Sequence, residues 1–319
     1  MRQFYLNLVL FLFSFASFAQ EDDMVQLKNV SDTILNPGRK LQITDRFDGL
    51  KAMKKLFPGK LYELPDRTPF LSWKCKNCKP ATYIDANGVE GDQLFPYTEG
   101  VATRLLENIN YTDSKTNQFK LLFFNHSVYD TDGAQTGRFS GGLVGVAKFA
   151  KNDNVWEMRS FQPAIAAFGA FSNAPSPKLV EIGEDQYAFT FIQSNGGAGA
   201  PYNGYLYLIV GFNGKYQPLM ELGYYNLTNN GGNSEWSGTY KVINDGKKKF
   251  FRDFEVTISG FYKKPKGTED DYEIDLPPEI AEMAKTKKQF NFVIEKRLSF
   301  SGKWYNVTGK PTVRFSNVK

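Results

Sequence analysis

The chain has 319 residues, and its 39 basic and 34 acidic side chains leave a net charge of +5 at pH 7. This small excess argues against nucleic-acid binding, which ordinarily requires a basic face or stripe. Hydrophobic residues make up 41% of the sequence and charged residues 23%, a composition typical of a folded chain with a substantial core. The 28 Phe, 17 Tyr and 4 Trp residues, together with 28 Gly and 15 Pro, favour strands joined by tight turns over helices.

Residues 1–19 have the features of a secretory signal peptide. Arg2 gives a short basic start, an apolar stretch follows at residues 6–13, and small residues lead up to Ala19. The apolar stretch is shorter than the roughly 20 residues that span a bilayer, which favours a cleaved signal over a retained anchor helix. We therefore expect a mature chain that starts at Gln20, has no transmembrane segment and is exported to the periplasm or the cell exterior.

Residues 20–59 form an N-terminal segment in which one short helix is expected. Asp45 is a suitable N-cap for a helix that continues to residue 57, because Pro58 and Gly59 then end the apolar pattern. The remaining residues, 60–319, are expected to form a β-repeat domain.

The two cysteines, Cys75 and Cys78, are three positions apart. In an oxidising compartment two close thiols most simply form a disulfide. A thioredoxin-like redox motif would open a helix, whereas Pro80 and the β-prone residues 81–84 follow here. A zinc site requires two further ligands, and the chain has a single His. The sequence favours a structural disulfide, with redox activity or metal binding as alternatives.

From about residue 100 the chain repeats one pattern, in which an alternating strand, a short polar turn and a returning strand follow each other. The turns at Asn213-Gly214 and Ser301-Gly302 are typical of β-hairpins. Each such hairpin is preceded by another, so that four strands make one unit. The three expected units cover about residues 100–161, 178–222 and 239–307.

These units predict an all-β fold of repeated four-stranded antiparallel meanders, arranged like the blades of a β-propeller. The uneven spacing of the units leaves a β-sandwich as the alternative. One or two short helices are expected beside the strands. The second would cover residues 279–288, since Pro277 and Pro278 precede it and its apolar residues share one face.

In an up-and-down sheet, successive connections alternate between opposite edges, so the long loops gather on one edge and the short turns on the other. Loops on a rigid scaffold carry most binding and catalytic residues. We therefore expect the functional surface at the long-loop edge, which contains residues 127–141, 162–177, 194–204, 224–238 and 260–288.

Four residues of this edge are candidates for ligand binding. Tyr202 ends a glycine-rich loop, and Trp236 follows Glu235 in an asparagine-rich loop. An aromatic face beside amides and a carboxylate suits a sugar or a polar peptide. Alternatively, Trp236 starts a strand and packs in the core. His126, the single His, ends a predicted strand and is a candidate general base, with a packed histidine as the alternative.

Asp130 and Asp132 precede Gly133 in the first long loop. Alternate acidic residues before a glycine place two carboxylates on one side of a turn, where calcium binds. The same pattern also forms an ordinary turn held by Asx hydrogen bonds. Calcium is the one cofactor that the sequence suggests.

Several enzyme signatures are missing from the sequence, including Gly-x-Ser-x-Gly and HExxH. Carboxylate chemistry on polysaccharides stays open, although no catalytic pair can be chosen. We therefore expect an exported, non-catalytic β-repeat binding protein that contacts a glycan or an envelope protein through its long-loop edge. A carboxylate-based glycoside hydrolase or lyase is the alternative, and a structural or assembly module is the third possibility.

Overall fold

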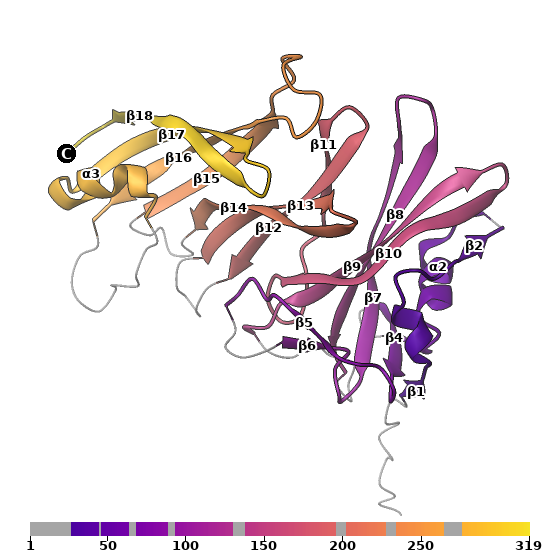
Figure 1. Cartoon of the computed structure of the whole chain (residues 1–319). Helices are drawn as coiled ribbons and strands as arrows, with labels where there is room; N and C mark the ends of the chain where they lie inside the picture. The colour runs from indigo at the N-terminus through magenta and orange to yellow at the C-terminus, as the bar shows by residue number, and fades with distance from the viewer. Residues whose placement is uncertain are drawn as a thin grey trace, which may run out of the picture.

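The structure is a computed structural model that describes residues 27–44, 46–63, 68–88, 93–129, 138–195, 202–227, 234–264 and 276–319. Strands dominate these residues and form two eight-stranded sheets and a small two-stranded one (Figure 1). The expected all-β class is confirmed, and two short helices accompany the strands. The small sheet consists of β5 (Ala81–Tyr83) and β6 (Gln93–Phe95).

The N-terminal sheet is built around an antiparallel meander of four long strands, β7 to β10. Short strands extend it at both sides: β4 pairs with β7, β1 and β3 pair with β4, and β2 pairs with β10. Its strands are β1 (Lys28–Asn29), β2 (Gln42–Ile43), β3 (Lys60–Glu63), β4 (Pro69–Lys74), β7 (Val101–Thr112), β8 (Gln118–Val128), β9 (Gly142–Asn152) and β10 (Val155–Phe168).

The C-terminal sheet is one continuous meander in which eight strands pair in chain order. Every pairing in it is antiparallel, as hairpin connections require. Its strands are β11 (Lys178–Gly183), β12 (Gln186–Asn195), β13 (Tyr202–Phe212), β14 (Lys215–Leu227), β15 (Ser234–Val242), β16 (Phe254–Lys263), β17 (Gln289–Phe300) and β18 (Tyr305–Ser316).

No propeller is confirmed: the first expected unit corresponds to the meander of β7 to β10, whereas the second and third belong to one eight-stranded sheet. The second and third expected units meet at β14 and β15, where Asn226 pairs with Trp236 and joins them into one sheet. Residues 224–227 and 234–238, expected in a long loop, are strand. A short turn fixes only its own hairpin, whereas the pairing between hairpins depends on packing against the rest of the chain.

The N-terminal sheet buries both of its faces, because alternate side chains of a strand point to opposite sides. Leu122 and Phe124 of β8 pack in a core beneath the helix α2 (Gly49–Leu56), which we call the helix-side core. Leu121 and Phe123, on the other face, pack against the second sheet in an inter-sheet core. The two sheets therefore pack against each other.

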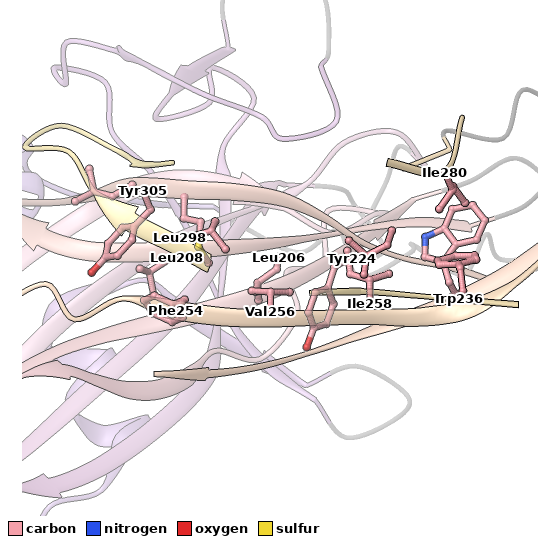
Figure 2. Close-up of a cluster of buried hydrophobic side chains, with 14 of the residues drawn as sticks. Leu206, Leu208, Tyr224, Trp236, Phe254, Val256, Ile258, Ile280, Leu298 and Tyr305 are labelled. Atoms are coloured by element: carbon pink, nitrogen blue, oxygen red, sulfur yellow. The ribbon is translucent and has the colours of Figure 1, made fainter. Parts of the chain in front are cut away.

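The C-terminal sheet is buried on both faces where β12 and β13 lie, whereas the outer faces of β15 and β18 are largely exposed. Its β13 contributes Tyr207 and Ile209 to the inter-sheet core. Leu206 and Leu208 point the other way, into a C-terminal core that includes Phe254 of β16 (Figure 2). The helical turn η2 (Pro278–Ile280) and the helix α3 (Ala281–Thr286) pack at one end of this core.

The first helix begins where a side chain caps it. The carboxylate of Asp48 accepts a hydrogen bond from the backbone N–H of Lys51 at 2.7 Å, so Asp48 is the N-cap. Asp45, the expected cap, lies outside the described residues. The helix then buries Ala52, Met53 and Leu56, and thereby covers one face of the N-terminal sheet.

The expected disulfide between Cys75 and Cys78 is present, with the two sulfur atoms 2.06 Å apart. Cys75 packs against the helix-side core, directly after β4. Residues 1–19 and Gln20 lie outside the described residues. Among the helices that the structure describes, none has the length and apolarity needed to cross a membrane.

Candidate functional site

A groove of about 750 Å³ lies between the two sheets, where residues 82–88, β10 and β14 approach one another. We call it the inter-sheet groove. Aromatic and polar side chains from distant parts of the sequence line it, among them Tyr83, Gln162, Tyr207, Tyr216, Glu221 and Trp304.

One wall of the groove is an added strand-like segment. The backbone N–H of Ala86 donates to the carbonyl oxygen of Ala167 at 2.9 Å, and the N–H of Ala167 donates to that of Ile84 at 2.8 Å. These bonds place the segment parallel to the end of β10. β2 pairs with the beginning of β10, at Trp156 and Glu157, so the edge near Ala167 is open to this segment, whose residues line the groove opposite β14.

Asp85 holds this wall in place. One carboxylate oxygen accepts hydrogen bonds from the backbone and side-chain N–H groups of Asn87, both at 2.9 Å, and the other accepts from the backbone N–H of Gly141 at 2.8 Å. Asn87 in turn donates to the carbonyl oxygen of Gly169 at 2.8 Å. The buried carboxylate therefore ties three chain segments together, and both of its oxygens are engaged.

Across the groove, β13 and β14 contribute two phenols and a carboxylate. Tyr207 and Glu221 are paired neighbours on these strands. Burial, and then the negative charge of Glu221, raise the pKa of Tyr207. Burial also raises the pKa of Tyr216. Both phenols therefore stay protonated at neutral pH and act as hydrogen-bond donors.

Trp304 reaches the groove from the turn between β17 and β18. Its carbonyl oxygen accepts hydrogen bonds from the backbone N–H and the hydroxyl of Ser301, both at 2.9 Å, which fix the turn. The residue is half-buried, and its side chain lines the groove together with Lys215 at the start of β14. The groove thus combines ring surfaces with an ammonium, a carboxylate and phenol donors.

No local sequence pattern identifies these groove residues as a site. Trp304 lies in a turn that was recognised only as a hairpin signal, and Tyr207 and Tyr216 follow ordinary strand patterns. Residues 83, 162, 216 and 304 come together only through the packing of the two sheets. The one local signal is Trp304 itself, a large aromatic residue in a polar turn.

Of the expected ligand-binding residues, none lines the groove. Trp236 is 4% exposed and packs in the C-terminal core, where its ring centroid is 6.0 Å from that of Phe292 (Figure 2). Glu235 is exposed on the opposite face of the same strand. Tyr202 begins β13, half-buried, and is paired with Leu227 of β14.

His126 is fully buried in the helix-side region of the N-terminal sheet. Its Nδ1 lies 2.8 Å from the hydroxyl of Thr103, and the rings of Phe57, Trp73 and Phe95 surround it. Burial lowers the pKa of the imidazole to about 3. The imidazole of His126 is therefore neutral and has no contact with solvent. It packs among aromatic rings instead of facing a site where it could act as a general base.

Asp130 and Asp132, the expected calcium ligands, lie outside the described residues, so the calcium site stays a prediction. Within the part of the chain that the structure describes, no three His, Cys, Asp or Glu side chains are grouped closely enough to hold a metal ion.

No family model, curated protein or solved structure matches this chain. The inter-sheet groove must therefore be interpreted from its own chemistry.

Proposed function

We propose that this protein is an exported, non-catalytic binding protein that holds a carbohydrate in the inter-sheet groove. The observation that carries the proposal is the convergence of Trp304, Tyr207 and Tyr216 with Lys215 and Glu221 around one concave surface. Sugar rings have apolar faces and a rim of hydroxyl groups. Aromatic rings with a polar edge match the faces, and fixed donors and acceptors match the hydroxyls.

The dimensions of the groove support a small or chain-like ligand. Its volume of about 750 Å³ falls within the range of roughly 300–1,000 Å³ that is typical of small-molecule sites. An envelope protein would more commonly bury a broad, flatter surface. We therefore place the binding surface in the groove rather than at the long-loop edge, and favour a glycan over a protein partner.

The distribution of carboxylates favours binding over catalysis. Among the described residues that line the groove, only Asp85 and Glu221 carry carboxylates. Glycoside hydrolysis ordinarily uses two, one as acid and one as base or nucleophile. Both oxygens of Asp85 accept hydrogen bonds from the protein, which leaves Glu221 as the carboxylate available to a ligand.

Export is supported by the Cys75–Cys78 disulfide together with the features of residues 1–19. Disulfides form and persist in oxidising compartments and are uncommon where glutathione keeps thiols reduced.

The proposal is tested with a panel of neutral, acidic and amino-sugar oligosaccharides, each titrated into the mature chain by isothermal titration calorimetry. A parallel assay measures the release of reducing ends or of unsaturated products. Saturable binding of at least one oligosaccharide without turnover is the expected result. Turnover would instead identify the carboxylate-based enzyme, and a complete lack of binding across the panel would overturn the proposal.

A further inference from the structure

A second concave surface, of about 580 Å³, lies on the N-terminal sheet, away from the inter-sheet groove. It forms where Thr44, Arg46 and Phe47 approach β8, β9 and β10, and we call it the basic pocket. Its lining includes three cationic side chains, those of Arg46, Lys120 and Lys151. None of the described residues that line it is acidic.

Lys120 is held in a fixed position within this pocket. Its Nζ lies 5.1 Å from the ring centroid of Phe47 and 4.9 Å from that of Trp156. The same nitrogen donates a hydrogen bond to the side-chain oxygen of Asn110 at 2.5 Å. Because an ammonium group has three donors, this arrangement orients Lys120 without using all of its hydrogen-bonding capacity.

Among the described residues, no ion pair balances the charges of the pocket. Burial, and then the nearby charge of Lys151, lower the pKa of Lys120. The ion pairs found among the described residues involve neither of these lysines nor Arg46. Like charges held close together at a partly buried site repel one another, and an anion between them would remove that repulsion.

We propose that the basic pocket binds a tetrahedral oxyanion, phosphate or sulfate, either free or carried by a larger ligand. Lys120, held by Asn110 and the two rings, is the fixed donor, and the exposed side chains of Arg46 and Lys151 supply the further positive charge. Guanidinium and ammonium groups form strong, charge-assisted hydrogen bonds to such oxygens. The side chains of Asn154 and Trp156 provide a polar contact and a ring surface for whatever carries the anion. This site is independent of carbohydrate binding in the groove.

The test titrates inorganic phosphate and sulfate into the full mature chain by calorimetry, with chloride added to keep the ionic strength constant. Two parallel titrations use a sulfated oligosaccharide and vesicles that contain an anionic phospholipid. Comparing them with the inorganic anions shows whether the pocket binds a free anion or an anionic group on a larger ligand. The variants are Lys151→Gln, which changes an exposed side chain, and Lys120→Met, which keeps the apolar length of the side chain. Lys178→Gln, which changes an exposed side chain of β11, is the matched control.

Saturable binding that weakens about tenfold in each pocket variant and is unchanged in the control is the expected result. The thermal unfolding of each variant is measured first, so that Lys151→Gln decides the outcome if Lys120→Met does not fold. The proposal is overturned if no arm shows saturable binding, or if the Lys178→Gln control weakens binding as much as the pocket variants do.

Discussion

The imidazole Nε2 of His126 lies 3.1 Å from the carbonyl oxygen of Pro163, in the bulge of β10. The hydroxyl of Thr103 accepts a hydrogen bond from the Trp73 indole at 2.8 Å, so its own hydrogen is directed to His126 Nδ1. Nε2 then carries the ring proton and donates a hydrogen bond to the carbonyl oxygen of Pro163. Because residues 164–166, which follow Pro163, line the inter-sheet groove, the single histidine supports the groove from behind.

The stability of the protein should therefore fall on acidification in a way that depends on His126. Burial lowers its pKa from 6.5 to about 3 in the folded state, so between these values the unfolded chain binds a proton that the folded chain does not. The contribution of the buried neutral imidazole to the free energy of unfolding is fully present above pH 6.5. It is lost by about 1.4 kcal/mol per pH unit below that value, until pH reaches about 3.

A His126→Gln variant separates this effect from the titration of carboxylates. It should be less stable than the parent at pH 7, because the hydrogen-bond chain from Trp73 to Pro163 is altered. Its free energy of unfolding, measured by urea denaturation, should vary less steeply between pH 6.5 and 5 than that of the parent. Equal slopes for the two proteins would show that the imidazole titrates normally in the folded state.

The side-chain amide of Gln162 bridges the sheets by bonding both backbone groups of one residue in β14. Its oxygen accepts from the N–H of Tyr216 at 2.7 Å, and its nitrogen donates to the carbonyl oxygen of Tyr216 at 2.9 Å. Gln162→Leu should reduce the free energy of unfolding by about 2–4 kcal/mol, since both backbone groups lose their partner. Gln118→Leu, at an exposed position of β8, should change it by less than about 0.5 kcal/mol.

Gly145 allows β9 to approach the bulge that His126 supports. A Cβ atom at this position would overlap the ring of Phe124 and the carbonyl oxygen of Pro163. Gly145→Ala should therefore destabilise the protein by about 1–3 kcal/mol or more, as measured by chemical denaturation. At Gly211 the nearest atom to an added Cβ is 3.5 Å away, so Gly211→Ala is the matched control and should be tolerated. Similar losses for both variants would argue against a close approach at Gly145.

The disulfide between Cys75 and Cys78 should contribute little to stability, because it closes a very short loop. Thiol labelling of the native protein should detect no free cysteine. The Cys75→Ser, Cys78→Ser double variant should fold and lose no more than about 2 kcal/mol. Two reactive thiols in the purified protein, or a larger loss of unfolding free energy in the double variant, would contradict the prediction of a disulfide that stabilises the fold only slightly.

Local signals in the sequence predicted the local elements well. Turns such as Asn213-Gly214 connect the strands that they were expected to connect, because a tight turn and its flanking alternation specify a hairpin together. The helix after Pro277 and Pro278 and the disulfide also depend on residues that are close in sequence. The arrangement of hairpins into two sheets depends on which apolar faces cover each other, and each central strand has two such faces.

The candidate site could not be predicted for the same reason. Trp236 was conspicuous beside Glu235, yet its ring is buried because β15 continues the sheet and η2 covers that face. The residues of the groove come from positions as far apart as Tyr83 and Trp304. Their proximity results from inter-sheet contacts such as the one between Gln162 and Tyr216, for which the sequence contains no periodic signal.

The most direct test of carbohydrate binding in the groove compares two tryptophans by calorimetry with the neutral oligosaccharide that binds best in the panel, because the basic pocket, which contains Trp156, is proposed to bind anions. Trp304 and Trp156 are both half-buried, but only Trp304 lines the groove. Trp304→Ala should weaken binding by about tenfold or more while the thermal unfolding of the protein changes little. Trp156→Ala should bind the oligosaccharide as the parent does. Unchanged affinity in a folded Trp304→Ala variant, or an equal loss in both variants, would contradict the assignment of the groove as the carbohydrate site.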